Sequence, residues 1–361
     1  MNSSSRRTLT PQRVPYKIWL IDEGHAGHRV QAEGILRALG SLGVQLDIAT
    51  IRCEPNLRGF LRPAAKAIFH YLRGVSALRF ASRIAQFSVP DDGLPRFIIS
   101  SGGRTAFVSR ALSLSTGAPN VFVGNLGRFP PQWFTVVMSP VDLKIPQSIV
   151  TGIVPNTMTP SECRDQSLIY WNNHVPKRCW TLLIGGANRN HPYNDQDWKD
   201  IAAGVNTLAQ KFDIKWLITT SRRTGAHVEQ LLEAAIAPNA VEELVLFSRA
   251  PKKVVMPFLG TAEIVFVTQD SLTMLGEAVA SGRPVVSLLP RTTRSFANSY
   301  GDKVLHNYHQ LPQLSTLRCS EMYNYLPYTD LSKTYEDSME LIKISAKALA
   351  AHLNIDHPAI E

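Results

Sequence analysis

Histidines and glycines crowd a short segment near the N-terminus, Asp22-Glu23-Gly24-His25-Ala26-Gly27-His28. Glycines allow a backbone to approach a ligand closely or to adopt positive φ. A histidine in such a turn can act as a general base or donate a hydrogen bond to a phosphate or a sugar hydroxyl. The glycine spacing is not that of the dinucleotide fingerprint. The segment indicates either a ligand-facing turn or a tight turn whose histidines are exposed to solvent.

A second glycine turn, Ser100-Ser101-Gly102-Gly103-Arg104-Thr105, precedes a segment that we expect to be helical. A cation at the start of a helix opposes the helix dipole, at a cost of about 0.3 kcal/mol or more unless it has an anionic partner. Arg104 therefore points to an anionic ligand, and the alternative is a salt bridge to a neighbouring acid.

Two segments in the second half of the chain combine glycines, hydroxyls and arginines. Gly185-Gly186-Ala187-Asn188-Arg189-Asn190 can cradle a phosphate through its backbone N–H groups, or it can be a plain loop. Thr219-Thr220-Ser221-Arg222-Arg223-Thr224 joins hydroxyls to two guanidinium groups, and arginine binds phosphate in a bidentate way. The alternative for this second segment is a solvated helix cap.

A third segment in this half, Thr268-Gln269-Asp270-Ser271-Leu272-Thr273-Met274, leads into a helical pattern. Asp270 or Ser271 can cap that helix, so that its free N–H groups face a ligand. Glu277 lies nearly two turns further along, where a carboxylate can bind the ribose hydroxyls of a nucleotide. As structure alone, the segment is an ordinary capped amphipathic helix.

These segments must be positioned by parallel strands, because short apolar runs alternate with amphipathic runs along the chain. The expected strands are Tyr16–Asp22, Val44–Ile51, Arg96–Ser100, Asn120–Val123, Thr135–Met138, Trp180–Ile184, Ile214–Thr219, Glu243–Phe247, Ile264–Val267 and Pro284–Leu288. The expected helices are His28–Gly40, Arg104–Leu114, Trp198–Lys211, Thr224–Ala237, Lys252–Gly260, Ser271–Ser281 and Leu331–Leu353. The proline-rich stretch 139–161 is expected to cross irregularly between two domains. Ligands of such α/β sheets bind beyond the carboxyl ends of the strands, where all five segments lie.

Several common catalytic motifs are missing from the sequence. It has no GxxxxGK[ST] loop, no HExxH and no DxD-like acidic pair after a strand. We therefore expect no metal site and no cofactor. The chain is expected to be a transferase that stabilises an anionic leaving group with helix dipoles and arginine.

Length and composition limit the remaining possibilities. A chain of 361 residues with 44% hydrophobic residues suits two globular domains. It contains no run of about 18 apolar residues that could span a bilayer. No apolar signal-like stretch precedes the first strand, and the four cysteines form no CxxC pair. These features predict a cytoplasmic protein with reduced thiols.

The formal net charge of +9 is concentrated in one place. The segment Arg52–Arg83 carries seven cations and a single acid, Glu54, interleaved with apolar residues. A basic amphipathic helix, or a pair of helices, could lie at the inner face of an anionic membrane or meet a phosphorylated glycolipid. A solvated helix pair is the alternative, and nucleic acid is not expected because no binding motif accompanies the charge.

With these segments in place, the chain resembles the Elm-type proteins, a family labelled "mitochondrial fission" and described in bacteria as GT-B glycosyltransferases. The matching motifs are GHAGHRVQ at Gly24–Gln31, GGRTA at Gly102–Ala106, LLIGG at Leu182–Gly186, TTSRRTG at Thr219–Gly225 and VTQDSLTMLGEAVASGRPV at Val267–Val285. Glu23 stands where we expect aspartate, which weakens a role for that acid, and Arg52–Arg83 has no place in the family pattern.

The resemblance implies two Rossmann-like lobes that face a central cleft, with the acceptor on the first lobe and the nucleotide sugar on the second. We expect an acceptor lobe at 1–160, a donor lobe at 161–330 and a C-terminal helix at 331–361 that packs back across both. The implied donor-binding residues are Gly185, Gly186, Ser221, Arg222, Arg223, Asp270 and Ser271. Those implied on the acceptor side are Gly24, Gly27, Gly103 and Arg104. His28 is the implied base for an inverting transfer; in a retaining transfer no base is needed and His28 would only orient the substrate. Glu277 completes the catalytic set.

The expected function is a metal-independent transfer of sugar from a nucleotide donor to a cell-envelope glycolipid, such as lipopolysaccharide, or to an oligosaccharide. A non-catalytic GT-B-derived factor in membrane or organelle division is the alternative. A sugar-nucleotide epimerase or hydrolase on the same fold is a third hypothesis.

Overall fold

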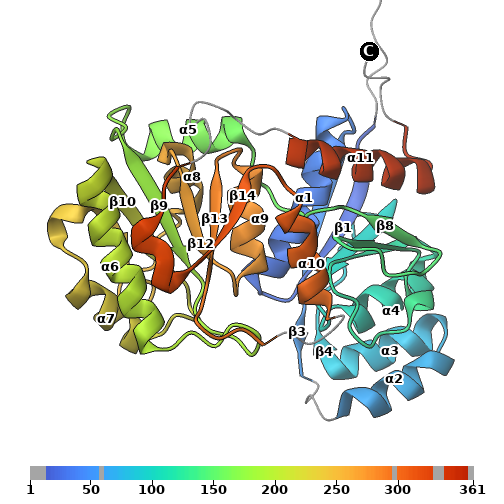
Figure 1. Cartoon of the computed structure of the whole chain (residues 1–361). Helices are drawn as coiled ribbons and strands as arrows, with labels where there is room; N and C mark the ends of the chain where they lie inside the picture. The colour runs from blue at the N-terminus through green and yellow to red at the C-terminus, as the bar shows by residue number, and fades with distance from the viewer. Residues whose placement is uncertain (1–13, 57–60, 295–298, 328–336, 357–361) are drawn as a thin grey trace, which may run out of the picture.

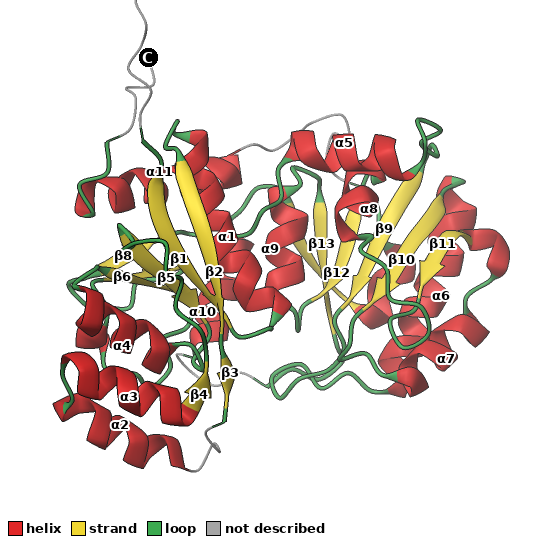
Figure 2. Cartoon of the chain, turned by 180° about the vertical axis from the view of Figure 1, so that it is seen from behind, coloured by secondary structure: helices red, strands yellow, loops and turns green. Residues whose placement is uncertain are grey.

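The computed structural model describes residues 14–56, 61–294, 299–327 and 337–356. Two parallel six-stranded sheets lie side by side, and each is flanked by helices (Figures 1 and 2). The predicted class, an α/β protein with two doubly wound lobes, is confirmed. None of the helices in these ranges is long and apolar enough to cross a bilayer.

The first lobe has the strand order β2-β1-β5-β6-β7-β8. Ile18 and Leu20 of its strand β1 pack in one core layer and Trp19 and Ile21 in another, so the strand is apolar throughout because both of its faces are buried. The strands are β1 (Tyr16–Asp22), β2 (Leu46–Arg52), β5 (Phe97–Ser101), β6 (Asn120–Val123), β7 (Val136–Ser139) and β8 (Ser148–Val150). The helices are α1 (Ala26–Ser41), α2 (Arg62–Tyr71), α3 (Gly74–Ile84) and α4 (Ala106–Thr116), with a short η2 (Pro131–Trp133). A small antiparallel pair, β3 (Glu54–Pro55) and β4 (Ala85–Gln86), brackets α2 and α3.

The second lobe has the order β11-β10-β9-β12-β13-β14. Its strands are β9 (Cys179–Ile184), β10 (Lys215–Thr220), β11 (Val241–Val245), β12 (Val265–Thr268), β13 (Val285–Leu289) and β14 (Leu314–Arg318). Its helices are α5 (Pro160–Tyr170), α6 (Asp195–Phe212), α7 (Ala226–Ala235), α8 (Val255–Thr261), α9 (Leu272–Ala280) and α10 (Tyr300–His309). Two short turns of helix, η3 (Pro238–Ala240) and η4 (Cys319–Asn324), complete it, and α11 (Asp337–His352) follows.

Each sheet changes its winding direction at one point. In the first sheet the chain runs from β1 outward to β2 and then returns to the other side of β1 at β5. In the second sheet it runs from β9 outward through β10 and β11 and then returns to β12. The crevice beyond the carboxyl ends of the strands at such a switch point is where open α/β sheets bind ligands.

The segment that links the lobes passes between α1 and α9. A Cβ on Gly34 of α1 would lie 2.5 Å from the backbone N of Asn156, so only glycine lets the linker approach this closely. The Asn156 side chain donates to the carbonyl of Gly276 in α9 at 3.2 Å, and the Tyr308 hydroxyl accepts the N–H of Val154 at 3.0 Å. One hydrophobic cluster runs through both lobes around this segment, which fixes α1 beside α9.

Several elements differ from the sequence prediction. The expected irregular crossing at 139–161 contains β8, whose three residues are too few to show an alternating pattern. The helices α5 and α10 and the strand β14 were not expected; in α5 polar and charged residues occupy most of the length. The basic segment does form two helices, α2 and α3, although its Arg58 lies outside the described residues.

Residues 331–336 of the expected C-terminal helix lie outside the described ranges. From Asp337 onward, α11 contacts α1 and β8 of the first lobe and α9 of the second. The domain boundaries at residues 160 and 330 stay predictions.

Candidate functional site

All five predicted segments lie at the carboxyl ends of strands beside the two switch points. The histidine turn follows β1 and the Gly102 turn follows β5, which are neighbours in the first sheet. The Gly185 turn follows β9, the Asp270 turn follows β12, and the Ser221 turn follows β10 on the other side of β9. The topology therefore gathers each lobe's predicted residues at one crevice.

Glu23 and His28 form a close polar pair in the first lobe. His28 Nδ1 lies 2.5 Å from Glu23 Oε1, and Glu23 Oε2 accepts the backbone N–H of Arg104 at 3.1 Å. The carboxylate is buried, whereas the imidazole is partly exposed. Because Nδ1 is held by the carboxylate, Nε2 is the ring nitrogen left without a hydrogen bond to any described residue. A base oriented in this way by a third group is the arrangement that activates a hydroxyl nucleophile.

Gly102 makes room for this pair. A Cβ at Gly102 would lie 2.3 Å from His28 Nδ1 and 2.5 Å from Glu23 Oε1, and the residue has φ +88°. Glu23 thus joins the β1 and β5 turns, although the sequence led us to expect a weakened role for the acid at this position; its part in catalysis stays a prediction. The predicted site residues included neither Glu23 nor Gly102, although both directly follow a strand.

Cationic side chains from both lobes surround His25. Its ring stacks on that of His28 with centroids 4.5 Å apart. Burial lowers the pKa of His25 most, and His28, Arg222 and Arg104 lower it further. Arg222 belongs to the second lobe, so the two lobes face each other here. Neither Arg104 nor Arg222 forms an ion pair with a carboxylate in the described ranges, which leaves positive charge for an anionic ligand.

The first turns of α1 and α9 approach each other across the cleft. A Cβ on Gly27 of α1 would lie 3.5 Å from Thr273 Oγ1 of α9. Ser271, not Asp270, caps α9, because its hydroxyl accepts the N–H of Met274 at 3.5 Å. Both helices therefore direct the positive ends of their dipoles to the same crevice.

The remaining glycines on the acceptor side shape the turns. Gly24 has φ +76° and donates its N–H to Asp22 Oδ1 at 2.8 Å. Gly103 packs against the ring of Phe129, which a Cβ there would approach to 3.2 Å.

In the second lobe, Gly185 and Gly186 are enclosed by the other two predicted turns. Gly185 donates its N–H to Thr268 Oγ1 at 2.8 Å, and its carbonyl accepts a hydrogen bond from the Ser221 hydroxyl. A Cβ on Gly186, at φ +131°, would lie 2.6 Å from the carbonyl oxygen of Arg223. The structure thus brings the β9, β10 and β12 turns together as one cradle.

Arg223 and Asp270 neutralise each other within this cradle. Arg223 Nη2 lies 2.8 Å from Asp270 Oδ2, and the carboxylate also packs against Gly185. Burial raises the pKa of Asp270 to about 6, against the opposing effect of Arg223. Of the two predicted guanidinium groups, Arg222 is therefore the one free to meet a ligand, and Arg223 holds the turn in place.

Glu277 stands apart from these groups. It lies one turn beyond Thr273 on the same face of α9 and makes no hydrogen bond or ion pair with a described residue. Burial raises the pKa of its carboxyl to about 7, with no neighbouring charge to oppose it. The structure does not bring Glu277 into contact with His28 or Arg222.

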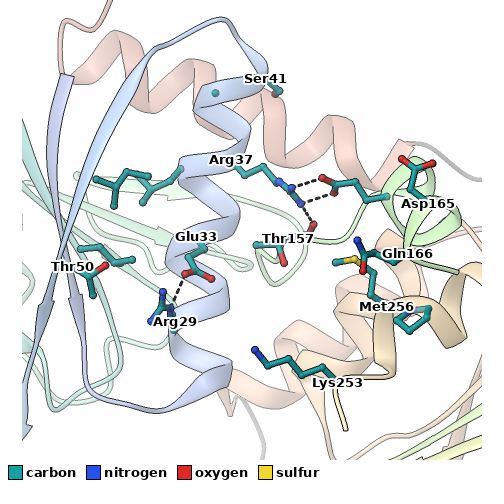
Figure 3. A pocket seen from close by; sticks show the side chains of 16 residues that line it. Arg29, Glu33, Arg37, Ser41, Thr50, Thr157, Asp165, Gln166, Lys253 and Met256 are labelled. Carbon is teal, nitrogen blue, oxygen red and sulfur yellow. Dashed lines mark hydrogen bonds and ion pairs between the residues drawn. The ribbon is translucent and has the colours of Figure 1, made fainter. Parts of the chain in front are cut away.

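Hollows lie beside the site. One of about 350 Å³ is lined by Glu23, Gly24 and Arg52, among others, at the carboxyl ends of β1 and β2. A larger groove of about 1140 Å³ runs between α1 and β2 of the first lobe and α5 and α8 of the second (Figure 3). Across this groove, Arg37 of α1 forms an ion pair with Glu162 of α5, which links the two lobes. None of the predicted site residues lines the groove. In the described part of the chain, no three histidine, cysteine or acidic side chains are grouped so as to hold a metal ion.

Solved structures share this architecture. UDP-GlcNAc 2-epimerase from Methanocaldococcus jannaschii is 12% identical, with a TM-score of 0.56 over 94% of this chain and 100% of that one. An S. aureus MnaA–UDP structure is 13% identical, with a TM-score of 0.50 over 95% and 99%. E. coli ADP-heptose lps heptosyltransferase II is 13% identical, with a TM-score of 0.46 over 94% and 97%. At these identities the likeness to the first two structures shows the fold alone, a GT-B arrangement of two Rossmann-like lobes.

No curated protein sequence matches the chain. The family described as mitochondrial fission ELM1 matches residues 26–313, which include every predicted site residue except Gly24. The chain belongs to the mitochondrial fission ELM1 family.

Proposed function

We propose that this protein is a glycosyltransferase that moves a sugar from a nucleotide donor to a cell-envelope glycolipid or oligosaccharide, without a metal ion, on the cytoplasmic side of the membrane. The observation that carries the proposal is the meeting of two unlike half-sites. An oriented His28–Glu23 pair on the first lobe faces the Arg222 turn and the α9 N-terminus on the second.

The chemistry of these half-sites suits a displacement at the anomeric carbon. The acceptor hydroxyl gives its proton to His28 Nε2 as its oxygen bonds to the sugar. The bond from that carbon to the diphosphate oxygen breaks, and the nucleotide leaves with the electron pair. Glu23 holds the imidazole and stabilises its charged form, and a direct displacement of this kind inverts the anomeric configuration.

The leaving diphosphate needs positive charge that does not depend on a metal. Arg222, together with the free N–H groups at the start of α9, can supply it. Gly185 and Gly186 let the phosphates approach the backbone, while Ser221, Arg223, Asp270 and Ser271 shape and cap the turns. In this proposal Glu277 binds the ribose hydroxyls.

Turnover assays with a panel of nucleotide sugars and a lipid extract test the proposal. We expect His28→Ala to lower nucleotide release by about 10²–10⁴-fold, the usual contribution of a general base, while nucleotide binding persists. His352→Ala, in the exposed last turn of α11, is the matched control and should leave turnover unchanged. Equal rates for His28→Ala and the parent protein would refute the assignment of the base.

The family match favours a second candidate, a GT-B-derived factor in membrane or organelle division that does no chemistry. It predicts that His28→Ala complements a deletion strain as well as the parent gene does. A sugar-nucleotide epimerase or hydrolase would instead yield product in the absence of any acceptor.

A further inference from the structure

The helices α2 and α3 present apolar side chains to solvent. Leu61 is 44% exposed, Ile68 52%, Tyr71 81% and Val75 62%. We call this surface the α2–α3 face. Figures 1 and 2 both place it at the outer corner of the first lobe, whereas α11 runs along the opposite end of the same lobe.

These side chains are not needed for the core of the lobe. Ala65 and Phe69 of α2, with Ala77 and Ala81 of α3, are the residues that are buried against α4 and the η2 segment. The exposed apolar residues do not belong to this buried cluster, and a solvated helix normally carries polar residues at such exposed positions. Exposed apolar clusters of this kind mark interaction surfaces.

The same helices carry positive charge without compensating acids. No aspartate or glutamate occurs between Glu54 and Asp91. Arg73, Arg79 and Arg83 are exposed and form no ion pair with a described carboxylate. Burial lowers the pKa of Arg110 in α4, and the nearby positive charge of Arg73 lowers it further. A partner for this face must therefore combine an apolar interior with negative charge.

Packing connects the α2–α3 face to the acceptor side of the cleft. Lys66 Nζ of α2 lies 4.0 Å from the centroid of the Phe129 ring and donates to the carbonyl of Arg128 at 3.0 Å. The Phe129 ring in turn packs against Gly103, next to Arg104. One layer of side chains thus separates α2 from the turn that carries Arg104.

We propose that the α2–α3 face docks on the surface of an anionic lipid bilayer and presents the acceptor turn to lipid head groups. Ile68, Tyr71 and Val75 enter the boundary between head groups and acyl chains, and the arginines meet the phosphates. The docking itself requires no catalysis. That the bilayer also supplies the acceptor rests on the proposed transferase function.

Vesicle sedimentation tests the docking. The full chain is mixed with phosphatidylcholine vesicles, with and without phosphatidylglycerol. We expect binding only with phosphatidylglycerol, and each cation near the surface contributes about fivefold. Arg79→Glu with Arg83→Glu should therefore lower binding by about 25-fold or more. Ile68→Ser with Tyr71→Ser should lower it and leave its salt dependence intact.

A matched control lies on α11, at the other end of the first lobe. Ile344→Ser with Lys347→Glu changes an exposed apolar residue and an exposed cation on α11, and should bind vesicles like the parent. Circular dichroism melts verify that each variant folds. Equal binding of the α2–α3 variants and the parent overturns the proposal. The proposal is also overturned if the parent protein is a dimer and the double variant Ile68→Ser with Tyr71→Ser is a monomer, because a second copy of the chain would then cover the α2–α3 face. Vesicle sedimentation tests the docking and nucleotide titration tests the donor site, so either proposal can fail while the other holds.

Discussion

Replacing Gly102 tests whether the His28–Glu23 pair is built as the structure shows. Gly102 and Gly24 both have positive φ, +88° and +76°, in turns at the same sheet edge. A Cβ on Gly102 would lie 2.3 Å from His28 Nδ1, whereas a Cβ on Gly24 would meet nothing within 4 Å. The two alanine variants therefore share the backbone cost, and only one of them disturbs the pair.

The expected magnitudes follow from this difference. Positive φ costs an alanine about 1–2 kcal/mol, so Gly24→Ala should lower the free energy of unfolding by that amount. Gly102→Ala adds a steric conflict with two side chains, which typically costs about 1–3 kcal/mol more. The gain from restricting the unfolded chain is the same for both variants and cancels in the comparison.

Urea unfolding measures the free energies, and NMR of the histidine ring nitrogens reports on His28. We expect the ring signals of His28 to shift in Gly102→Ala and to remain unchanged in Gly24→Ala. If both variants lose the same stability and keep the same His28 signals, the imidazole does not lie against Gly102 and the proposed base is misplaced.

The other predictions concern the lobe interface and α9. Gly34→Ala should lower the free energy of unfolding by about 3 kcal/mol, because its Cβ would lie 2.5 Å from the backbone N of Asn156. A Cβ on Gly40, in the same helix, would meet nothing within 4 Å, so Gly40→Ala should not destabilise the protein. Thermal melts compare the two variants. The pKa of Glu277 is about 7 in the folded protein against 4.5 ordinarily, so stability should fall as pH rises between those values. Glu277→Gln should therefore raise the free energy of unfolding at pH 8 by about 1–3 kcal/mol and leave it unchanged at pH 4. The exposed Glu340→Gln is the control. An equal effect of Glu277→Gln at both pH values, or an equal gain in Glu340→Gln, would contradict the raised pKa of the Glu277 carboxyl.

Much of the fold could be predicted because strands buried on both faces have continuous apolar runs. Tyr16–Asp22 and Asn120–Val123 are strands with the expected bounds, and the turns after them follow. The strand β8 has only three residues and is partly exposed, so no pattern marks it. The helix α5 was missed because polar and charged residues occupy most of its length.

The site was predictable as a set of turns but not as a set of contacts. Rules for strand ends placed Ser221, Arg222 and Asp270 at one crevice. No sequence rule says that Arg223 pairs with Asp270 and leaves Arg222 free, because that depends on how two turns meet in space. The role of Glu23 depends in the same way on the approach of the β5 turn.

Calorimetric titration with UDP, GDP and CMP in the presence of EDTA is the most direct test of a metal-free nucleotide site in the second lobe. The parent protein should bind at least one of these nucleotides. Arg222→Ala should weaken that binding by about tenfold or more, because a charge-assisted hydrogen bond contributes about 1.5–3 kcal/mol. Arg178→Ala, which removes an exposed arginine at the other end of β9, should bind like the parent. If no nucleotide binds the parent protein, or if Arg222→Ala binds as tightly as the parent, the crevice is not a donor site.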